Sequence, residues 1–348
     1  PVAYGGTEAV LDSLARGLAD VGHDVLLFTT GDSTCPVLRV SVFEQSLGVG
    51  TATAGAASEL RHVIAAYEIV ADYDVVHDHT LVGPVYADRL PWLPVITTNH
   101  APFASDLGPL YQAVRDRVPV IAISHHQAAA AHDVNLAGVI HHGVDTDRFP
   151  VGKGDGGYAL FLGRMNPDKG VHLAIEIARE AGVPLRIAAK MREKVEQDYF
   201  DDYVSPLLGG DIEYLGEVAA DDKLELLGAA KCLLNPIQWP EPFGMVMIEA
   251  LATGTPVVAT PAGAAPEIVT SAVTGFLAPD DDGLVEAVRR IDEIDRHACR
   301  REVEARFSAR RMVDEHVRAY EKVIEERRRV VFGADPDAVT GASSLRPT

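Results

Sequence analysis

The chain has 348 residues, of which 47% are hydrophobic and 6% aromatic, enough apolar material for the cores of two domains of ordinary size. It carries 31 lysines and arginines against 51 aspartates and glutamates, and this formal charge of −20 argues against nonspecific binding to nucleic acid or to an anionic membrane surface. No apolar run approaches the roughly 20 residues of a membrane span. Three isolated cysteines, Cys35, Cys232 and Cys299, are typical of a reducing compartment, so we expect a cytoplasmic protein without a disulfide framework.

The first half of the chain alternates helical stretches with apolar runs that have the composition of strands. A helix predicted over residues 7–21 is followed by the runs DVLLFTT, YDVVHDH, PVITTNH, VPVIAIS and GVIHHGV. Such alternation indicates a parallel sheet covered by helices on both faces. The segment PVAYGGTEAVL at residues 1–11 has the pattern of a loop after a first strand. Because the neighbours of a central strand need its backbone groups as partners, we expect about 10–12 preceding residues to supply that strand.

A second alternating series follows a polar, glycine-rich linker, TDRFPVGKGDGG, at about residues 146–157. We therefore predict an α/β protein with two doubly wound, Rossmann-like domains, over residues 1–150 and 156–306. If two such domains face one another, the carboxyl ends of their strands, and thus their ligand crevices, lie on a central cleft. A charged helix over residues 308–330 is expected to pack back on the N-terminal domain, and residues 331–348 form a polar tail.

The segment FLGRMNPDKG, at residues 161–170, predicts a strand, a short loop and the start of a helix. Arg164 and Lys169 then lie beside a helix N-terminus, where fixed donors and the helix dipole favour a diphosphate. The alternative is ordinary surface pairing with the many acidic residues. In YGGTEAVL, at residues 4–11, two glycines before a helix allow a phosphate to approach the backbone, but a simple tight turn has the same sequence.

Many of the histidines follow predicted strands, which raises the question of a metal site. Successive strand residues point to opposite faces, so adjacent pairs do not converge easily on one ion, and we predict no metal. His100, at the end of PVITTNH, is the best single candidate for the cleft, with a structural role as the alternative. Asp72 and Asp74 form a DxD pattern ahead of a strand, where solvated loop residues are expected.

The segment EPFGMVMIEA, at residues 241–250, places two glutamates in otherwise apolar surroundings. A helix that is apolar on all sides is normally buried, so the carboxylate of Glu249 needs a partner. Glu241 precedes the helix, where the free amides of residues 243–246 point at an anion, and it can accept hydrogen bonds from sugar hydroxyls. Glu249 lies roughly 7–9 Å further along, about the distance from a terminal sugar past two phosphates to a ribose. The alternative for Glu249 is a buried glutamate satisfied by another side chain or by backbone.

These motifs together resemble the retaining glycosyltransferases of GT-B fold in the large nucleotide-sugar family numbered four. Residues 241–249 are similar to the E-x7-E signature of that family. The likeness covers nearly the whole chain, with YGGTE, VVHDH, TTNH, VIHHGVDTDRF, LGRMNPDKG, GAAPEIV and TGFL in the family's order. The sequence is also similar to enzymes that assemble oligosaccharide antibiotics such as avilamycin.

The resemblance implies a role for each matching residue. Arg164 and Lys169 would neutralise the diphosphate, Glu241 would hold the sugar, and His100 would lie near the donor sugar and the acceptor. Lys190, in Ala188-Ala189-Lys190 where many members have glycines, implies a further phosphate contact or only packing, and His142-Gly143 replaces the usual Asn-Gly. The remaining donor contacts would come from Gly6 at the diphosphate, Leu215 to Val218 at the base, Phe243, Gly244, Met245 and Val246 through their backbone, and Glu249 at the ribose diol.

The implied reaction is retaining hexosyl or pentosyl transfer from a nucleotide diphosphosugar, most simply a UDP-sugar, to an acceptor. No isolated nucleophilic carboxylate is evident, which favours front-face substitution, without a metal or cofactor because the cations and the helix dipole stabilise the leaving group. The N-terminal domain lacks a Lys/Arg cluster, so a small soluble acceptor is expected and strong membrane binding is not. Two alternatives are a sugar-nucleotide epimerase and a noncatalytic nucleotide-sugar sensor. The oligomeric state is left open.

Overall fold

The computed structural model describes residues 5–46, 52–104 and 106–332 of the chain, which divides into two compact units. Unit 1 contains residues 5–21, 124–127 and 141–313, and unit 2 contains residues 22–123, 128–140 and the chain from 314 onward. The predicted domain ranges are continuous along the chain, whereas each unit is assembled from separate segments.

Unit 1 is built on a six-stranded parallel sheet in the order β12-β11-β10-β7-β8-β9. The chain therefore starts in the middle of the sheet, adds two strands on one side and then three on the other, which is the doubly wound arrangement. The strands are β7 (Ala159–Arg164), β8 (Leu185–Lys190), β9 (Ile212–Gly216), β10 (Cys232–Asn235), β11 (Val257–Ala259) and β12 (Gly275–Leu277). The switch point, where ligands bind in such sheets, lies between β7 and β10.

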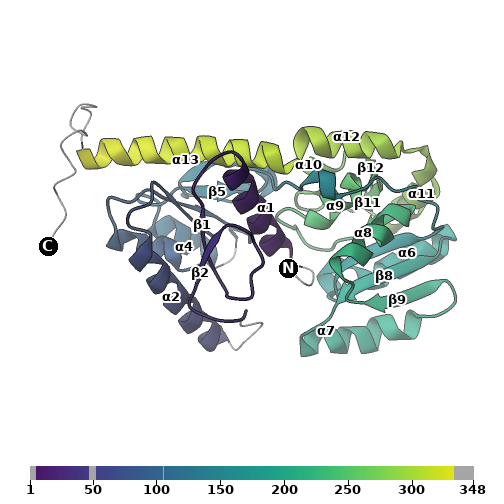
Figure 1. Ribbon diagram of the computed structural model, residues 1–348. Coiled ribbons are helices and arrows are strands. Elements are labelled where there is room, and N and C mark those ends of the chain that lie inside the picture. Colours follow the sequence, from purple (N-terminus) through teal and green to yellow (C-terminus); the bar gives the residue numbers. More distant parts are fainter. Residues whose placement is uncertain (1–4, 47–51, 105, 333–348) are drawn as a thin grey trace. The chain divides into compact units, whose positions relative to one another are not determined.

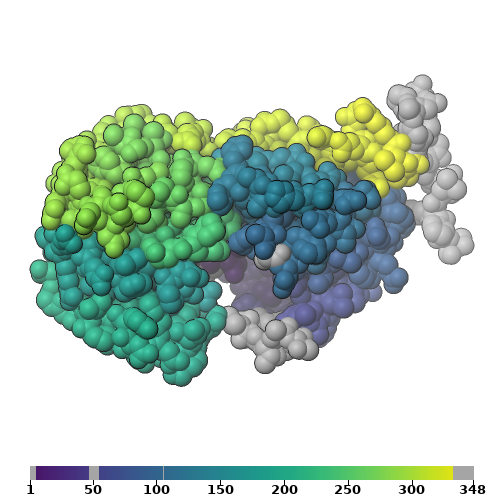
Figure 2. Space-filling model, turned by 180° about the vertical axis from the view of Figure 1, so that it is seen from behind, coloured from purple at the N-terminus to yellow at the C-terminus, as the bar shows by residue number. Residues whose placement is uncertain are grey.

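Helices connect these strands, and α6 packs against α11 while α9 packs against α12. The connection from β7 to β8 contains α6, and the connection from β10 to β11 contains α9. These two connections run in opposite directions from the switch point. Because both are right-handed, α6 and α9 lie on opposite faces of the sheet. In Figure 2 the long segment of unit 1, residues 141–313, appears as a packed body of mainly teal and green atoms. Its helices are α1 (Gly6–Asp20), α6 (Val171–Ala181), α7 (Lys194–Tyr199), α8 (Ala220–Ala229), α9 (Met245–Ala252), α10 (Ala265–Ile268), α11 (Asp281–Arg289) and α12 (Arg296–Arg306), with short turns η2 (Thr146–Arg148), η3 (Pro167–Lys169), η4 (Phe200–Val204), η5 (Ser205–Leu207) and η6 (Ile291–Glu293).

The helix α9 is buried along its length, as its apolar sequence predicts. From Val246 to Ala252 each residue is at most 7% exposed, including Glu249 at 4%. Fully burying a leucine or isoleucine side chain contributes about 1.5–3 kcal/mol, so this helix is a main element of the core.

Unit 2 contains a four-stranded parallel sheet in the order β3-β4-β5-β6 and a separate parallel pair, β1-β2. The strands are β1 (Leu26–Thr29), β2 (Leu38–Ser41), β3 (Val76–Asp78), β4 (Val95–Thr98), β5 (Val120–Ala122) and β6 (Leu136–Val139). The helical elements are α2 (Ala52–Ile69), α3 (Gly83–Tyr86), η1 (Ala87–Arg89), α4 (Leu107–Ala113) and α5 (His125–Ala129), which begins in unit 1. The strand expected ahead of residue 1 lies outside the described residues.

The last helix, α13 (Ala309–Phe332), is drawn as one uninterrupted helix in Figure 1. From residue 314 onward it belongs to unit 2, where the hydroxyl of Tyr320 lies 2.7 Å from Nδ1 of His77. Its predicted range of 308–330 is close to the observed one, and residues 333–348 of the predicted tail lie outside the described part of the chain. None of the described helices combines the length and the apolar character that crossing a membrane requires.

The α/β class and the two Rossmann-like sheets are confirmed, and most predicted strands contain an observed one. Two strands differ from prediction. The strand β6 begins at Leu136, before the predicted run GVIHHGV, and it ends at Val139, near the start of that run. The strand β2 was not predicted, because all its residues are exposed and its sequence has no apolar run of the kind that marks a buried strand.

Candidate functional site

The candidate site of unit 1 begins where β7 ends beside β10, at the switch point. Arg164 is the last residue of β7, and the chain then turns through η3 to Lys169. Gly170 follows with φ 72°, and a Cβ there would lie 2.1 Å from the carbonyl oxygen of Pro236. A glycine is therefore required for the loop to pass this close to the segment after β10.

Arg164 is held by two carboxylates of the segment that starts α7. Its Nη2 lies 2.8 Å from Oε1 of Glu193, and its Nε donates to Oε1 of Glu196 at 2.8 Å. Glu196 is 1% exposed, and its Oε2 accepts from the amides of Arg192 and Glu193. Burial raises the pKa of Glu196, but these amides and Arg164 outweigh it and leave the pKa below its usual value. The guanidinium is thus oriented by a fixed carboxylate while 43% of its side chain stays exposed.

Lys169 and Glu241 form an ion pair, with 2.6 Å between Nζ and Oε1. Their side chains are 18% and 20% exposed, and Nζ also lies 5.4 Å from the centre of the Trp239 ring. The structure therefore joins the predicted diphosphate cation to the predicted sugar carboxylate. A partly buried, hydrogen-bonded pair of this kind is held more firmly than one on the open surface.

The backbone before α9 is shaped by Gly244, which has φ 101° and ψ 66° at the N-cap. Phe243 is 2% exposed, so its ring anchors this turn in the core. A Cβ on Gly6 would lie 3.5 Å from Cγ of Met245, so the glycine loop of α1 lies beside the first turn of α9. Four predicted backbone contacts, Phe243, Gly244, Met245 and Val246, thus form one turn, with Gly6 next to it.

Glu249 lies in the core side of α9 and pairs with Lys223 of α8, with 2.7 Å between Nζ and Oε1. Lys223 is therefore the partner expected if Glu249 is simply a buried glutamate satisfied by another side chain. The other oxygen, Oε2, is buried and has no hydrogen-bond partner among the described residues. The predicted ribose role of Glu249 therefore depends on Oε2 alone.

The remaining predicted donor contacts lie at the carboxyl ends of neighbouring strands. Lys190 ends β8 and is in register with Arg164 of β7. Leu215 is in β9 and Val218 follows it, and both are partly buried. All three are on the same edge of the sheet as the switch point, because parallel strands end on one side.

His100 belongs to unit 2, where it is part of a histidine cluster. Its Nε2 lies 3.0 Å from Nδ1 of His79, whose ring centre is 4.0 Å from that of His77. The ring centre of His316, on α13, lies 5.3 Å from that of His77. The cluster, which we define as His77, His79, His100 and His316, joins the ends of β3 and β4 to α13.

In the histidine cluster His316 is buried and His77, His79 and His100 are partly buried, which disfavours their charged forms. Burial lowers the pKa of His100 to about 4, with a smaller contribution from His316. Burial and the neighbouring imidazoles also lower the pKa of His77 and of His79. With these lowered pKa values, the rings of His77, His79 and His100 are uncharged at neutral pH and act as hydrogen-bonding groups.

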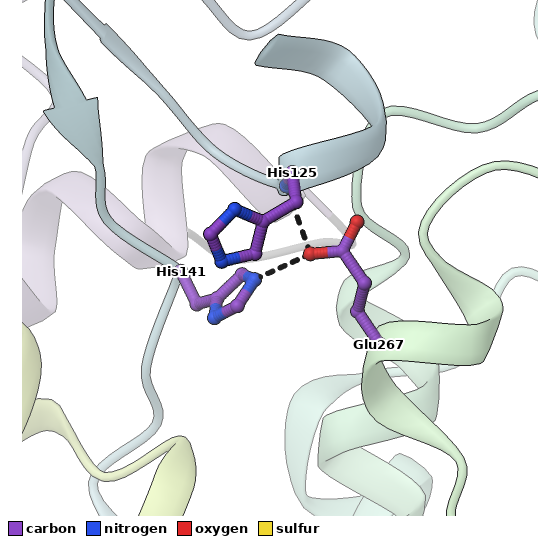
Figure 3. Close-up of side chains that lie close together, drawn as sticks. All are labelled: His125, His141 and Glu267. Carbon is purple, nitrogen blue, oxygen red and sulfur yellow. Dashed lines mark hydrogen bonds and ion pairs between the residues drawn. The ribbon is translucent and has the colours of Figure 1, made fainter. Parts of the chain in front are cut away.

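Unit 1 has its own group of histidines, which surrounds Glu267 of α10 (Figure 3). Its Oε2 accepts from the amide of His125 and from Nε2 of His141, each at 2.8 Å, and its Oε1 accepts from the amide of His126 at 2.7 Å. Burial would raise the pKa of Glu267, but the hydrogen bonds from His141 and from the two amides outweigh it and lower the pKa to about 2. Glu267 is thus a carboxylate at every pH near neutrality.

Sequence reasoning did not assign roles to Glu193, Glu196 and Glu267. Their side-chain partners are 29 or more residues away along the chain, so no local spacing reveals the pairs. Glu267 lies in the segment GAAPEIV, where it directly follows a proline in a short helix. This position was the one local sign in the sequence that Glu267 could have a special role.

Two protein-family models match adjoining parts of the chain: Glycosyltransferase Family 4 over residues 4–148 and Glycosyl transferases group 1 over residues 144–306. Together they span both predicted domains, and their boundary falls close to the predicted linker.

Individual proteins agree with these matches. The chain is 27% identical over 325 residues to a phosphatidyl-myo-inositol mannosyltransferase of Mycolicibacterium smegmatis, covering 84% of this chain and 82% of that protein. It is 26% identical to AviGT4, a glycosyltransferase involved in avilamycin A biosynthesis, with a TM-score of 0.69 and coverage of 93% of this chain and 92% of that one. HepE of Anabaena, solved with UDP-glucose, has the same fold, with 21% identity, a TM-score of 0.74 and coverage of 92% and 97%. The chain is therefore a glycosyltransferase of GT-B fold that belongs to the group 1 and family 4 glycosyltransferases.

Proposed function

We propose that this glycosyltransferase moves a hexosyl or pentosyl group from a UDP-sugar to a small soluble acceptor, with retention of anomeric configuration. The observation that carries this proposal is the pair of Lys169 and Glu241, placed between the switch point and the first turn of α9. A cation for a diphosphate and a carboxylate for sugar hydroxyls are held next to one another there, as transfer from a diphosphosugar needs.

In the proposed reaction, the acceptor oxygen attacks the anomeric carbon from the face that the diphosphate leaves. The bond between that carbon and the diphosphate oxygen breaks, the new glycosidic bond forms, and the acceptor proton passes to the leaving oxygen. Arg164, Lys169 and the amides that begin α9 stabilise the charge that develops on the diphosphate. These groups supply the stabilisation that a metal ion gives in other phosphate chemistry, so we propose that transfer needs no metal.

The other predicted residues complete the donor site in this proposal. Glu241 binds sugar hydroxyls, Glu249 binds the ribose through Oε2, and Lys190 reaches a phosphate. The edge formed by Leu215 and Val218 takes the base. The orientation of Arg164 by Glu196 supports the role of Arg164 at the diphosphate, because a preoriented cation loses less entropy on binding.

Similar proteins support the proposed donor and the proposed biosynthetic role. HepE was solved with UDP-glucose, which supports a UDP-sugar. AviGT4 is involved in avilamycin A biosynthesis, which supports a role in making an oligosaccharide antibiotic. The buried thiols of Cys232 and Cys299, neither of which forms a disulfide, support a cytoplasmic location.

The first experiment is a thermal-shift screen of the chain against UDP, GDP, ADP and TDP and their sugars. We expect the largest stabilisation from UDP compounds, since a ligand that binds only the folded state raises its stability. Sugar transfer is then followed with the stabilising donor, and the anomeric configuration of the product is read by NMR. An inverted product contradicts retention. Donor binding without transfer or hydrolysis to any acceptor favours a sensor, and a changed sugar without an acceptor favours an epimerase.

Substitution of Lys169 tests the cation role directly. We expect Lys169→Ala to lower turnover by about 10²–10³, because it removes a group that stabilises the leaving diphosphate. The control is Lys194→Ala, whose side chain is 81% exposed on the surface of unit 1. Circular dichroism and melting temperature verify that both variants fold. Full turnover in Lys169→Ala contradicts the role, and loss of activity after treatment with EDTA contradicts metal independence.

A further inference from the structure

Two imidazoles and one carboxylate of unit 1 converge from three segments of the chain. His125 begins α5, His141 follows β6, and Glu267 lies in α10. One ligand atom of each, a ring nitrogen or a carboxylate oxygen, lies within 4.8 Å of the corresponding atoms of the other two. Figure 3 shows the two rings next to each other on the same side of the carboxylate.

The three groups are held by contacts that leave ligand atoms available. The carboxylate of Glu267 is fixed by the amides of His125 and His126, which is the outer hydrogen bonding typical of metal-binding carboxylates. The carbonyl oxygen of His141 accepts from Nη2 of Arg311, and its ring packs against Phe307 with 5.7 Å between centres. The backbone of His141 and the oxygens of Glu267 are therefore already positioned.

The hydrogen bonds between Glu267 and the start of α5 do not explain why residue 125 is a histidine. Glu267 caps the start of α5 through main-chain amides, for which any residue type except proline would serve at position 125. The imidazole of His125 is exposed, makes no hydrogen bond to another described residue, and has its ring centre 5.6 Å from that of His141. It can rotate toward the carboxylate without disturbing the core.

We propose that His125, His141 and Glu267 form a binding site for a first-row divalent transition metal of the Zn²⁺ class. Zn–N and Zn–O distances near 2.1 Å place the ligand atoms of a tetrahedral ion about 3.4 Å apart. The ligand atoms now lie within 4.8 Å of one another. Rotation of the exposed His125 ring brings its nitrogen to the shorter distance that a bound ion requires. Imidazole donors favour Zn²⁺, Co²⁺, Ni²⁺ and Cu²⁺ over Mg²⁺ and Ca²⁺, which prefer oxygen ligands.

The proton balance of binding follows from the observed hydrogen bond. In the metal-free site, Nε2 of His141 donates its proton to Oε2 of Glu267. On binding, the metal takes the place of this proton at Nε2, and the neutral ring keeps its one proton on Nδ1. Three protein ligands leave a fourth position for water. The site adjoins the turn before α9, because the ring centre of His141 lies 5.8 Å from that of Phe243. The proposed transfer needs no metal, so either proposal can fail while the other stands.

The test uses the full, untagged chain after chelator treatment and gel filtration. Zn²⁺ affinity and stoichiometry are measured by competition with a chromophoric chelator, and Co²⁺ is added separately to record its visible absorption. We expect one Zn²⁺ per chain and the absorption bands of four- or five-coordinate Co²⁺. We expect His125→Ala and Glu267→Gln each to weaken Zn²⁺ binding by at least about tenfold, the lower limit for loss even of an outer-shell group.

The matched control is His126→Ala. His126 is the exposed neighbour of His125, and it contributes its amide to Glu267 while its ring is outside the three-residue group. This variant should bind Zn²⁺ as the unchanged chain does. Absence of stoichiometric binding overturns the proposal, as does equal binding in His125→Ala and His126→Ala. His125→Ala changes an exposed side chain, so a melting temperature near that of the unchanged chain keeps its result interpretable.

Discussion

The two glutamates of EPFGMVMIEA differ in how their charge is compensated. Glu241 pairs with Lys169 in a partly exposed position, whereas Glu249 is 4% exposed and pairs with Lys223. A carboxylate in the core needs such a partner, since an unpaired buried charge costs several kcal/mol. The sequence could predict that Glu249 had a partner but not that it would be Lys223, which lies on another helix.

Whether Oε2 of Glu249 also binds a ribose can be measured. We expect the unchanged chain to bind UDP about tenfold or more tightly than 2′-deoxy-UDP, because a hydrogen bond to a charged group contributes about 1.5–3 kcal/mol. In Glu249→Gln this preference should shrink, as measured by titration calorimetry.

The control for this comparison is Lys223→Met, which removes the ion pair but keeps the carboxylate. It should lower the melting temperature while keeping the preference for UDP. If Glu249→Gln and Lys223→Met keep the same preference, Glu249 has a structural role only.

At the scale of elements, α9 joins the core of unit 1 to its candidate site. Its apolar residues fix the position of the helix, and Gly244 sets the direction of the backbone at its start. With φ 101° this residue adopts a conformation that costs a non-glycine residue about 1–3 kcal/mol.

We expect Gly244→Ala to destabilise the chain by about 1–3 kcal/mol and to weaken donor binding, because the amides that follow are turned away from the diphosphate. The melting temperature should fall by roughly 2–4 °C per kcal/mol. The control is Gly55→Ala in α2, an exposed position where a Cβ meets nothing within 4 Å. That change should stabilise by roughly 0.5–1 kcal/mol. A melting temperature for Gly244→Ala at or above that of the unchanged chain argues against this account.

Elements with a strong local pattern could be predicted, and sites made by distant segments could not. The run YALFLGR predicts β7 because every residue suits a buried strand, and α9 is predicted because its sequence is apolar throughout. Glu267 meets His125 and His141 only after three segments fold together, and no spacing in the sequence encodes that meeting. The same is true of Glu196, whose burial follows from its place beside β7.

At the scale of the whole molecule, the histidine cluster makes stability depend on pH. The pKa of His100 is about 4 in the folded chain and near 6.5 when unfolded, so below about pH 6.5 the unfolded chain binds more protons. Stability is therefore lost as pH falls from about 6.5 to about 4, with a slope of about 1.4 kcal/mol per pH unit for each such proton. Glu267 adds a loss only between about pH 4.5 and pH 2, because its folded pKa is about 2.

We expect the melting temperature to fall steeply between pH 7 and pH 4, and the fall to be shallower in His79→Gln, which removes one buried imidazole. Differential scanning calorimetry at half-unit pH steps measures both slopes. The control is His132→Gln, an exposed position in unit 2 that should keep the original slope. Identical slopes in all three proteins would show that acid sensitivity has another source.

The division of unit 1 into separate segments affects how the chain folds during synthesis. The helix α1, which ends at Asp20, belongs to a unit whose last segment ends at residue 313. At 5–20 residues per second, a ribosome adds the intervening residues in roughly 15–60 s. During that interval α1 has been made but Val313, which lies against Gly17 of this helix, has not. Val10, Leu14 and Ala15, which are buried in the folded chain, are then exposed in the nascent chain, so we expect this first helix to bind chaperones until the last segment of its unit is made.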